Sequence, residues 1–173
     1  HELWDEKKVR EKAPYLSKNC GEVMWVGEGQ VNNRQLHDSL MAASRKLGVQ
    51  ILEENVSGFV REGSKVSAAV TGTSEVEGDQ FVLASGSWSG QLAKVLDVAL
   101  PLKPIKGQMC RLKLEDHFLD YTIHGMMTYI APWKEGNGFV VGSTMEDKGF
   151  DSSVEDKVIE NLIARAAEIL PAL

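Results

Sequence analysis

Residues 81–90 read FVLASGSWSG, and this stretch decides most of what the sequence predicts about the fold. The apolar run at 81–84 predicts a short strand covered on both faces, because continuous apolar strands are typical of buried sheets. Gly86 then permits a sharp turn, and a short helix is expected over about residues 91–96. The N–H groups at such a junction can bind an anion or a nucleotide phosphate. A tight turn without a ligand is the alternative.

The residues before this stretch predict one helix and a β-hairpin. Asn33 is the expected cap of a helix that runs to about Leu47 and stops at Gly48. Its apolar face is formed by residues at spacings of four, three and four, namely Leu36, Leu40, Ala43 and Leu47. A short buried strand is predicted at 49–52. Strands at 56–61 and 66–73 flank a turn at 62–64 and form the hairpin.

The residues after it predict an antiparallel sheet and a second helix. Pro101 and Pro104 interrupt regular structure, as a linker or crossing point between subdomains would. Residues 108–114 alternate as a strand, and 127–133 with 139–143 form a hairpin around Asn137-Gly138. An amphipathic helix is expected from about residue 154, capped by Ser152 or Ser153. The predicted fold class is therefore mixed α/β, with an antiparallel sheet in the second half.

Composition bounds the class of protein. The 173 residues amount to one ordinary domain or two small ones, and 43% hydrophobic residues suffice for a core. A net charge of −6 argues against nucleic acid, whose binders usually carry a basic face. The apolar stretches are shorter than the roughly 20 residues of a membrane helix. Cys20 and Cys110 are far apart and form no CxxC, so we expect a reducing, cytoplasmic location.

Metal and acyl-transfer chemistry lack their motifs. The four histidines form neither HxH nor HExxH, so no metal site is predicted; they are His1, His37, His117 and His124. Residues 86–90 superficially resemble a nucleophile elbow, but Trp88 stands where that motif has its serine. The chain also contains neither GxGxxG nor a Walker pattern.

Several segments, in chain order, resemble motifs of the D-amino-acid oxidase and glycine oxidase superfamily of flavoproteins. Residues 29–36 (GQVNNRQL) are similar to G-x-V-(D/N)-x-x-x-L, and 82–89 (VLASGSWS) to V-(L/V)-A-(A/S)-G-x-W-(S/T). Residues 101–108 (PLKPIKGQ) resemble P-(V/L)-x-P-(V/I)-(R/K)-G-Q. Residues 129–132 and 142–146 resemble the pair Y-(I/L)-x-P and G-x-T-x-E. The glycine oxidase-like branch fits better than sarcosine oxidases or glycerol-3-phosphate dehydrogenases, which stay as alternatives.

The resemblance implies a fold and a domain layout. It implies the middle portion of a flavoprotein oxidase of the FAD/NAD(P)-binding type, with a mostly antiparallel substrate-domain sheet and part of the cofactor domain. Residues 1–30 would be a linker or entry to the substrate domain, starting with a possible tag remnant. Residues 31–100 would be part of the FAD-binding domain without its GxGxxG unit, and 101–173 a truncated substrate-binding domain. We expect an internal piece of a longer protein; a complete small protein processed at its N-terminus is the alternative.

The same resemblance implies the residues of the site. Contacts to FAD would come from Val56, Ala84, Ser85, Gly86, Trp88 and Gln108. Tyr129 would hydrogen-bond a substrate carboxylate through its hydroxyl, and Met145 would line the substrate pocket. Core packing is the alternative role of each of these residues. No catalytic residue is assigned, because the flavin carries the electron chemistry and no general base is demanded.

The implied reaction is the FAD-dependent oxidation of glycine or another small amine or amino acid. A hydride leaves the α-carbon, the imine is hydrolysed, and oxygen is reduced to peroxide. Without the phosphate-binding turn, this piece alone is expected to bind FAD weakly or not at all and to be inactive. Its open sheet edges favour self-association. A self-standing α/β binding module without a redox role is the alternative.

Overall fold

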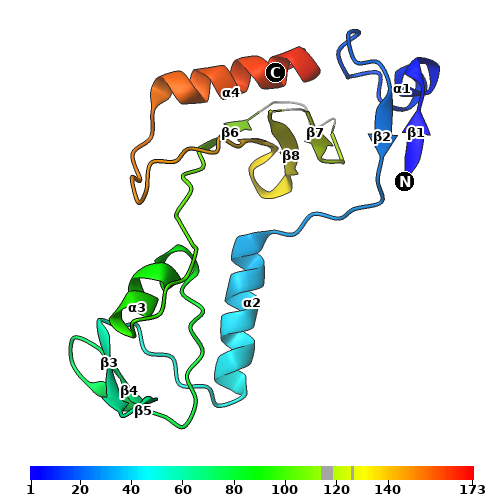
Figure 1. Ribbon diagram of the computed structural model, residues 1–173. Coiled ribbons are helices and arrows are strands. Elements are labelled where there is room, and N and C mark those ends of the chain that lie inside the picture. The colour runs from blue at the N-terminus through cyan, green and yellow to red at the C-terminus, as the bar shows by residue number, and fades with distance from the viewer. Residues whose placement is uncertain (114–118, 126) are drawn as a thin grey trace. The chain divides into compact units, whose positions relative to one another are not determined.

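The computed structural model describes residues 1–113, 119–125 and 127–173, which form two compact units. The first unit consists of residues 1–30 and 105–173, and the second consists of residues 31–104. Both contain helices and antiparallel strands (Figure 1). The predicted mixed α/β class is confirmed.

The first unit contains a four-stranded antiparallel sheet in the order β6-β9-β8-β7. Its strands are β6 (Met109–Lys113), β7 (Ile123–His124), β8 (Tyr129–Trp133) and β9 (Gly138–Gly142). The hairpin predicted at Asn137-Gly138 joins β8 to β9, and Asn137 takes the left-handed conformation with φ 49° after the 3-10 turn η2 (Lys134–Gly136). The predicted strand 108–114 is β6, and its last residue, Leu114, lies outside the described residues.

Gly138 is required by the close pairing of β9 with β6. A Cβ built at this position would lie 1.9 Å from the carbonyl oxygen of Leu112. Because that atom belongs to the backbone of the paired strand, no rotamer change relieves the overlap. Glycine therefore sets how closely these two strands approach.

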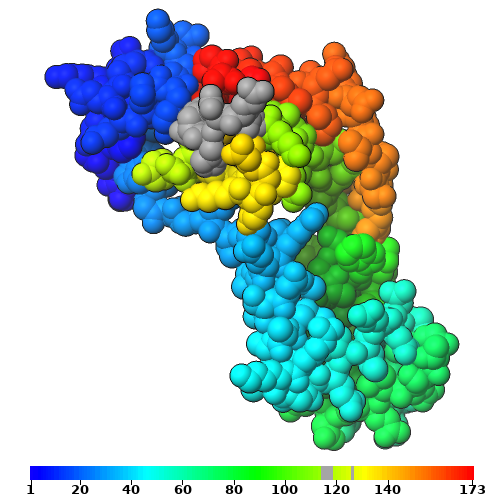
Figure 2. Space-filling view, turned by 180° about the vertical axis from the view of Figure 1, so that it is seen from behind, coloured from blue at the N-terminus to red at the C-terminus, as the bar shows by residue number. Residues whose placement is uncertain are grey.

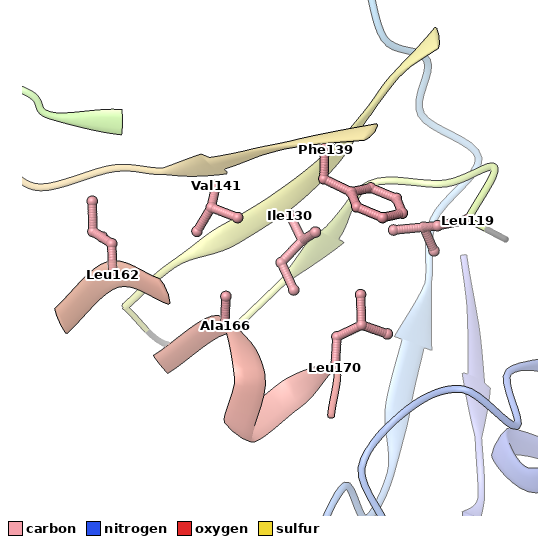
Figure 3. Packing of buried hydrophobic residues seen from close by; sticks show 7 residues of the cluster. All are labelled: Leu119, Ile130, Phe139, Val141, Leu162, Ala166 and Leu170. Atoms are coloured by element: carbon pink, nitrogen blue, oxygen red, sulfur yellow. The ribbon is translucent and has the colours of Figure 1, made fainter. Parts of the chain in front are cut away.

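Helix α4 (Asp156–Ile169) covers one face of this sheet. Side chains from the sheet, from the segment before β7, and from α4 and its C-cap point toward one another and form a core, namely Leu119, Ile130, Phe139, Val141, Leu162, Ala166 and Leu170 (Figure 3). The predicted apolar stripe of the helix is confirmed. The predicted cap is wrong, because the N-cap is Glu155 and its N–H donates to the side chain of Gln108 at 2.8 Å. Ser153 instead contacts Asp151 and Lys106.

The first residues of the chain fold into the first unit, although the sequence showed no strand or turn signal there. Strand β1 (Glu2–Trp4) pairs with β2 (Val23–Trp25), and α1 (Glu6–Lys12) lies between them in sequence. The Arg10 guanidinium donates to four backbone carbonyls in residues 16–20. Trp4 stacks on Trp25 with ring centroids 5.2 Å apart. These contacts order a segment for which the sequence predicts a linker that starts with a possible tag remnant.

The second unit contains a three-stranded antiparallel sheet and two helices. Its elements are α2 (Asn33–Lys46), β3 (Gly58–Glu62), β4 (Lys65–Val70), β5 (Glu75–Glu77), the 3-10 turn η1 (Gly86–Trp88) and α3 (Ser89–Val95). The predicted β3–β4 hairpin is confirmed, and β5 adds a strand that was not predicted. The cap of α2 is Asn32 and not Asn33, because the Asn32 side chain accepts hydrogen bonds from the N–H groups of Arg34 and Gln35. Gly48 ends the helix with φ +83°, as expected.

Two strands predicted in the second unit are wrong. Residues 49–52 and 81–84 form no strand, and Val82 is 90% exposed. Within the described residues no strand pairs with either segment, so their backbone lacks the ladder that a buried strand requires. The leucines of α2 are also exposed, and Figure 2 shows this helix, in light blue, with a broad face uncovered.

Candidate functional site

A cavity of about 610 Å³ in the second unit brings together three of the predicted cofactor residues, Val56, Ala84 and Ser85. Most of its wall is apolar and comes from the β3–β4 hairpin, residues 81–83 and α3. Ser85 shares a hydrogen bond with Ser89 between their hydroxyls, which are 3.1 Å apart. Gly86 and Trp88 form the turn that follows directly.

The shape and chemistry of this cavity fit an aromatic ring system. Its volume lies in the usual range for ligand sites, and apolar walls with few polar groups are typical of such sites. Gly86 has φ +54°, and a Cβ there would meet nothing within 4 Å, so its backbone is open to close approach. In the described part of the chain, no glycine-rich turn opens a helix of eight or more residues. The cavity could therefore accommodate a flat aromatic ring.

Tyr129 lies in the first unit, on the face of the sheet opposite to α4. Its neighbours in register are Gly142 on β9 and His124 on β7, and the ring of His124 lies 6.0 Å from that of Tyr129. The Tyr129 hydroxyl is 2.9 Å from the point where a Cβ of residue 142 would lie. Gly142 therefore leaves the space over which the half-buried ring of Tyr129 extends. This arrangement fixes the position of a phenolic hydroxyl on that face.

The other two predicted residues of the first unit differ from each other in exposure. Met145 is 84% exposed and follows β9 by three residues. Gln108 is 5% exposed, and both polar atoms of its side chain are hydrogen-bonded within the unit. Its predicted contact with the cofactor stays a prediction, whereas its contact with the start of α4 is a structural role that the sequence did not reveal.

Charged side chains surround Gln108. Hydrogen bonds from Thr144 and Gln108 lower the pKa of Glu146 from its ordinary 4.5 to about 2. The buried ammonium of Lys106 contacts Asp151 at 2.7 Å and holds the pKa of that carboxyl well below its ordinary value. A cavity of about 350 Å³ adjoins Lys106 and Asp151. Both carboxylates are therefore ionised at neutral pH and join neighbouring segments of the first unit.

Sequence reasoning missed this network, although its members stand in the motifs quoted above. Thr144 and Glu146 belong to the G-x-T-x-E pattern, and Gln108 ends the pattern at 101–108. The motifs contain these three residues, but their spacing in the sequence does not show that their side chains are in contact. Among the described residues, no three His, Cys, Asp or Glu side chains gather where a metal ion could be held. His117 lies outside the described residues.

Comparison with known proteins identifies the family. The chain matches the family described as FAD dependent oxidoreductase (DAO) over residues 1–173. The chain belongs to this family. It is 38% identical over 153 residues to glycine oxidase of Pseudomonas aeruginosa, covering 87% of this chain and 42% of that protein. The resemblance of the motifs to this family is confirmed.

Solved structures of FAD dependent oxidoreductases share the fold. Glycine oxidase from Bacillus cereus matches with a TM-score of 0.87 and 29% identity, covering 99% of this chain and 48% of that chain. A glycerol-3-phosphate dehydrogenase from Bacillus halodurans, complexed with FAD, matches with a TM-score of 0.69 at 19% identity, covering 99% of this chain and 38% of that one. The chain thus spans less than half the length of these relatives. In its described residues no helix is long and apolar enough to cross a membrane.

Proposed function

We propose that the protein to which this chain belongs oxidises the CH–NH bond of glycine or another small amine or amino acid with FAD. The observation that carries the proposal is the Tyr129 hydroxyl held over Gly142 on the face of the sheet opposite to α4. The identity of 38% to a glycine oxidase supports the choice of substrate class. The products are an imine, which water hydrolyses, and hydrogen peroxide.

In this proposal the first unit recognises the substrate. The Tyr129 hydroxyl donates a hydrogen bond to the carboxylate, which orients the α-carbon. Met145 supplies a polarizable apolar wall that adapts to the rest of the substrate. When bound, FAD accepts the hydride of the amine and passes two electrons to oxygen. The partner is thus a small molecule, and we place the reaction in the cytoplasm.

The second unit holds one end of the cofactor. The backbone at Val56 and the turn of Ala84, Ser85 and Gly86 line the adenine end. Trp88, at the end of that turn, is 58% exposed in this chain, so its predicted packing behind the turn is wrong and its contact with the cofactor stays a prediction. Gln108, in the substrate-binding part, is still proposed to contact FAD. Residues 31–100 then serve the cofactor and 101–173 the substrate, while residues 1–30 fold with the substrate part. The 173-residue chain alone should bind FAD weakly and be inactive, because charge-assisted pyrophosphate contacts contribute roughly 1.5–3 kcal/mol each.

The test uses the full-length protein. We expect a yellow protein whose visible absorbance bleaches when glycine, sarcosine or a small D-amino acid is added without oxygen. In air, the protein should form one hydrogen peroxide for each imine. Y129F should weaken the affinity for substrate about tenfold, the value of one hydrogen bond to a charged group. Y121F, which changes another tyrosine of the first unit, serves as the control. A colourless protein, or one that forms no peroxide from any of these amines, contradicts the proposal.

A further inference from the structure

Two segments of the first unit are joined by their backbones near the end of the sheet. Lys106 and Glu146 exchange two backbone hydrogen bonds, each 2.9 Å long. Two residues further along, the N–H of Thr144 donates to the carbonyl of Gln108 at 3.2 Å, and the N–H of Gln108 donates to the Thr144 hydroxyl at 2.9 Å. Segments 106–108 and 144–146 therefore pair beyond the ends of β6 and β9, in a register shifted by one residue.

The carboxylate of Glu146 ties the side chains of these segments together. Its Oε1 accepts from Nε2 of Gln108 at 2.8 Å and from the Thr144 hydroxyl. Its Oε2 lies 3.2 Å from the ammonium of Lys148. The remaining oxygen of the Gln108 amide accepts from the N–H of Glu155 at the start of α4. One carboxylate thus links both segments and, through Gln108, the helix.

Two exposed methionines project from the same segments. Met145 stands between Thr144 and Glu146, and Met109 follows Gln108. Met109 begins β6, and because successive side chains of a strand point in opposite directions, it faces away from Gln108. Met145 is 84% exposed between the half-buried Thr144 and Glu146. Met109 is 56% exposed. Its Cβ lies 3.1 Å from the point where a Cβ of Gly142 would be, and the Tyr129 hydroxyl lies 2.9 Å from that point.

We infer that Glu146 is a positioning residue of the substrate site, because it holds Met109 beside Tyr129 and Met145 beyond Gly142. The inference rests on the proposed function, which places substrate at the Tyr129 hydroxyl. Met109 and Met145 then form the apolar walls that limit the size of the amine. Met109 is in this account a specificity-determining residue. Loss of the Glu146 charge weakens the hydrogen bonds that this side chain accepts from Gln108 and Thr144, and so lets both walls move.

The test compares full-length, FAD-loaded wild type with E146Q, E146D and the control E160Q, whose carboxylate is exposed on α4. The readouts are KM and kcat for glycine and the Kd of acetate, measured from the change that it causes in the flavin spectrum. We expect E146Q to raise KM and the acetate Kd about tenfold with kcat within about twofold, as the loss of one charged hydrogen bond implies. E146D should recover part of the affinity, and E160Q should equal wild type.

Wild-type KM and acetate Kd in E146Q would overturn the inference, as would equal losses in E146Q and E160Q. If E146Q fails to retain FAD, M109A decides the question. This variant should raise kcat/KM for bulkier D-amino acids relative to glycine at unchanged flavin content. An unchanged preference overturns the inference, while oxidation of glycine by the wild type keeps the proposed function. A wild type that oxidises no amine instead contradicts the proposed function itself.

Discussion

The two units of the chain differ in how they use their apolar residues. The first unit buries large side chains such as Phe139, Ile130 and Leu162, whereas the described buried apolar residues of the second unit are Ala68 and Ala93. Helices α2 and α4 both carry an apolar face, but only that of α4 is covered by a sheet. An amphipathic pattern therefore reveals which face requires burial and not what covers it. We infer that further parts of a longer protein cover the second unit.

The largest expected effect breaks the core of the first unit. F139A removes a fully buried aromatic ring between the sheet and α4 and should lower the free energy of unfolding by about 3–5 kcal/mol. L40A truncates a side chain that is 59% exposed on α2 and should change it by less than about 0.5 kcal/mol. Urea unfolding of the 173-residue chain, followed by circular dichroism, measures both. Equal losses would show that the second unit has a core of its own.

A backbone overlap gives the next largest effect. G138A places a methyl group against the carbonyl of Leu112 and should destabilise the first unit by about 3 kcal/mol. G72A in the second unit meets nothing within 4 Å and should change the free energy of unfolding by less than about 0.5 kcal/mol. The same urea titrations apply. A neutral G138A would mean that β6 and β9 are less closely paired than described.

Short-range signals made the β8–β9 hairpin and helix α4 of the first unit predictable. The Asn137-Gly138 hairpin depends on one left-handed residue, and the stripe of α4 depends on spacing within a single helix. The strand expected at 81–84 failed because its pairing depends on partners that local sequence does not specify. The cap of α4 failed for the same reason, since Gln108 reaches Glu155 from a distant part of the chain. The predictions that were wrong are those that depend on contacts between residues distant in the sequence, which local propensities do not reveal.

A smaller effect sharpens the account of α2. N32A removes the side chain that accepts from the N–H groups of Arg34 and Gln35, and should cost about 1 kcal/mol of helix stability. N33A, one residue later, should cost less because that side chain does not cap the helix. Amide exchange of the first turn of α2 measures both changes. The reverse order would restore the cap that the sequence alone suggested.

The smallest expected effect is on how the free energy of unfolding changes as the pH is lowered. Because the pKa of Glu146 is lowered from 4.5 to about 2 in the folded chain, unfolding takes up a proton as the pH falls. Its contribution to stability is therefore complete above about pH 4.5 and is lost toward pH 2. E146Q should be less stable than wild type at pH 7 and lose less stability on acidification. Urea titrations from pH 7 to acid, with E160Q as the control, measure the slope; parallel slopes in E146Q and wild type would contradict this account.

The candidate site was predictable where a motif names a residue and not where residues act together. Tyr129 is a letter of the motif Y-(I/L)-x-P and Met145 stands at an unspecified position of G-x-T-x-E, and their roles stay predictions. Val56, Ala84 and Ser85 line one cavity. Gly142 opens the G-x-T-x-E motif, but the motif did not reveal its role, which is to leave room for the Tyr129 hydroxyl, because an absent side chain has no chemistry of its own. Met109 likewise became visible only through its register opposite Gly142.

Hydrogen exchange of the 173-residue chain and of the full-length protein tests the difference between the units most directly. We predict that amides of β8, β9 and α4 are protected in both. Amides of α2 and of residues 81–84 should exchange rapidly in the 173-residue chain and slow strongly in the full-length protein. Equal protection of both units in the 173-residue chain alone would contradict the account, because the second unit would then need nothing further to cover it.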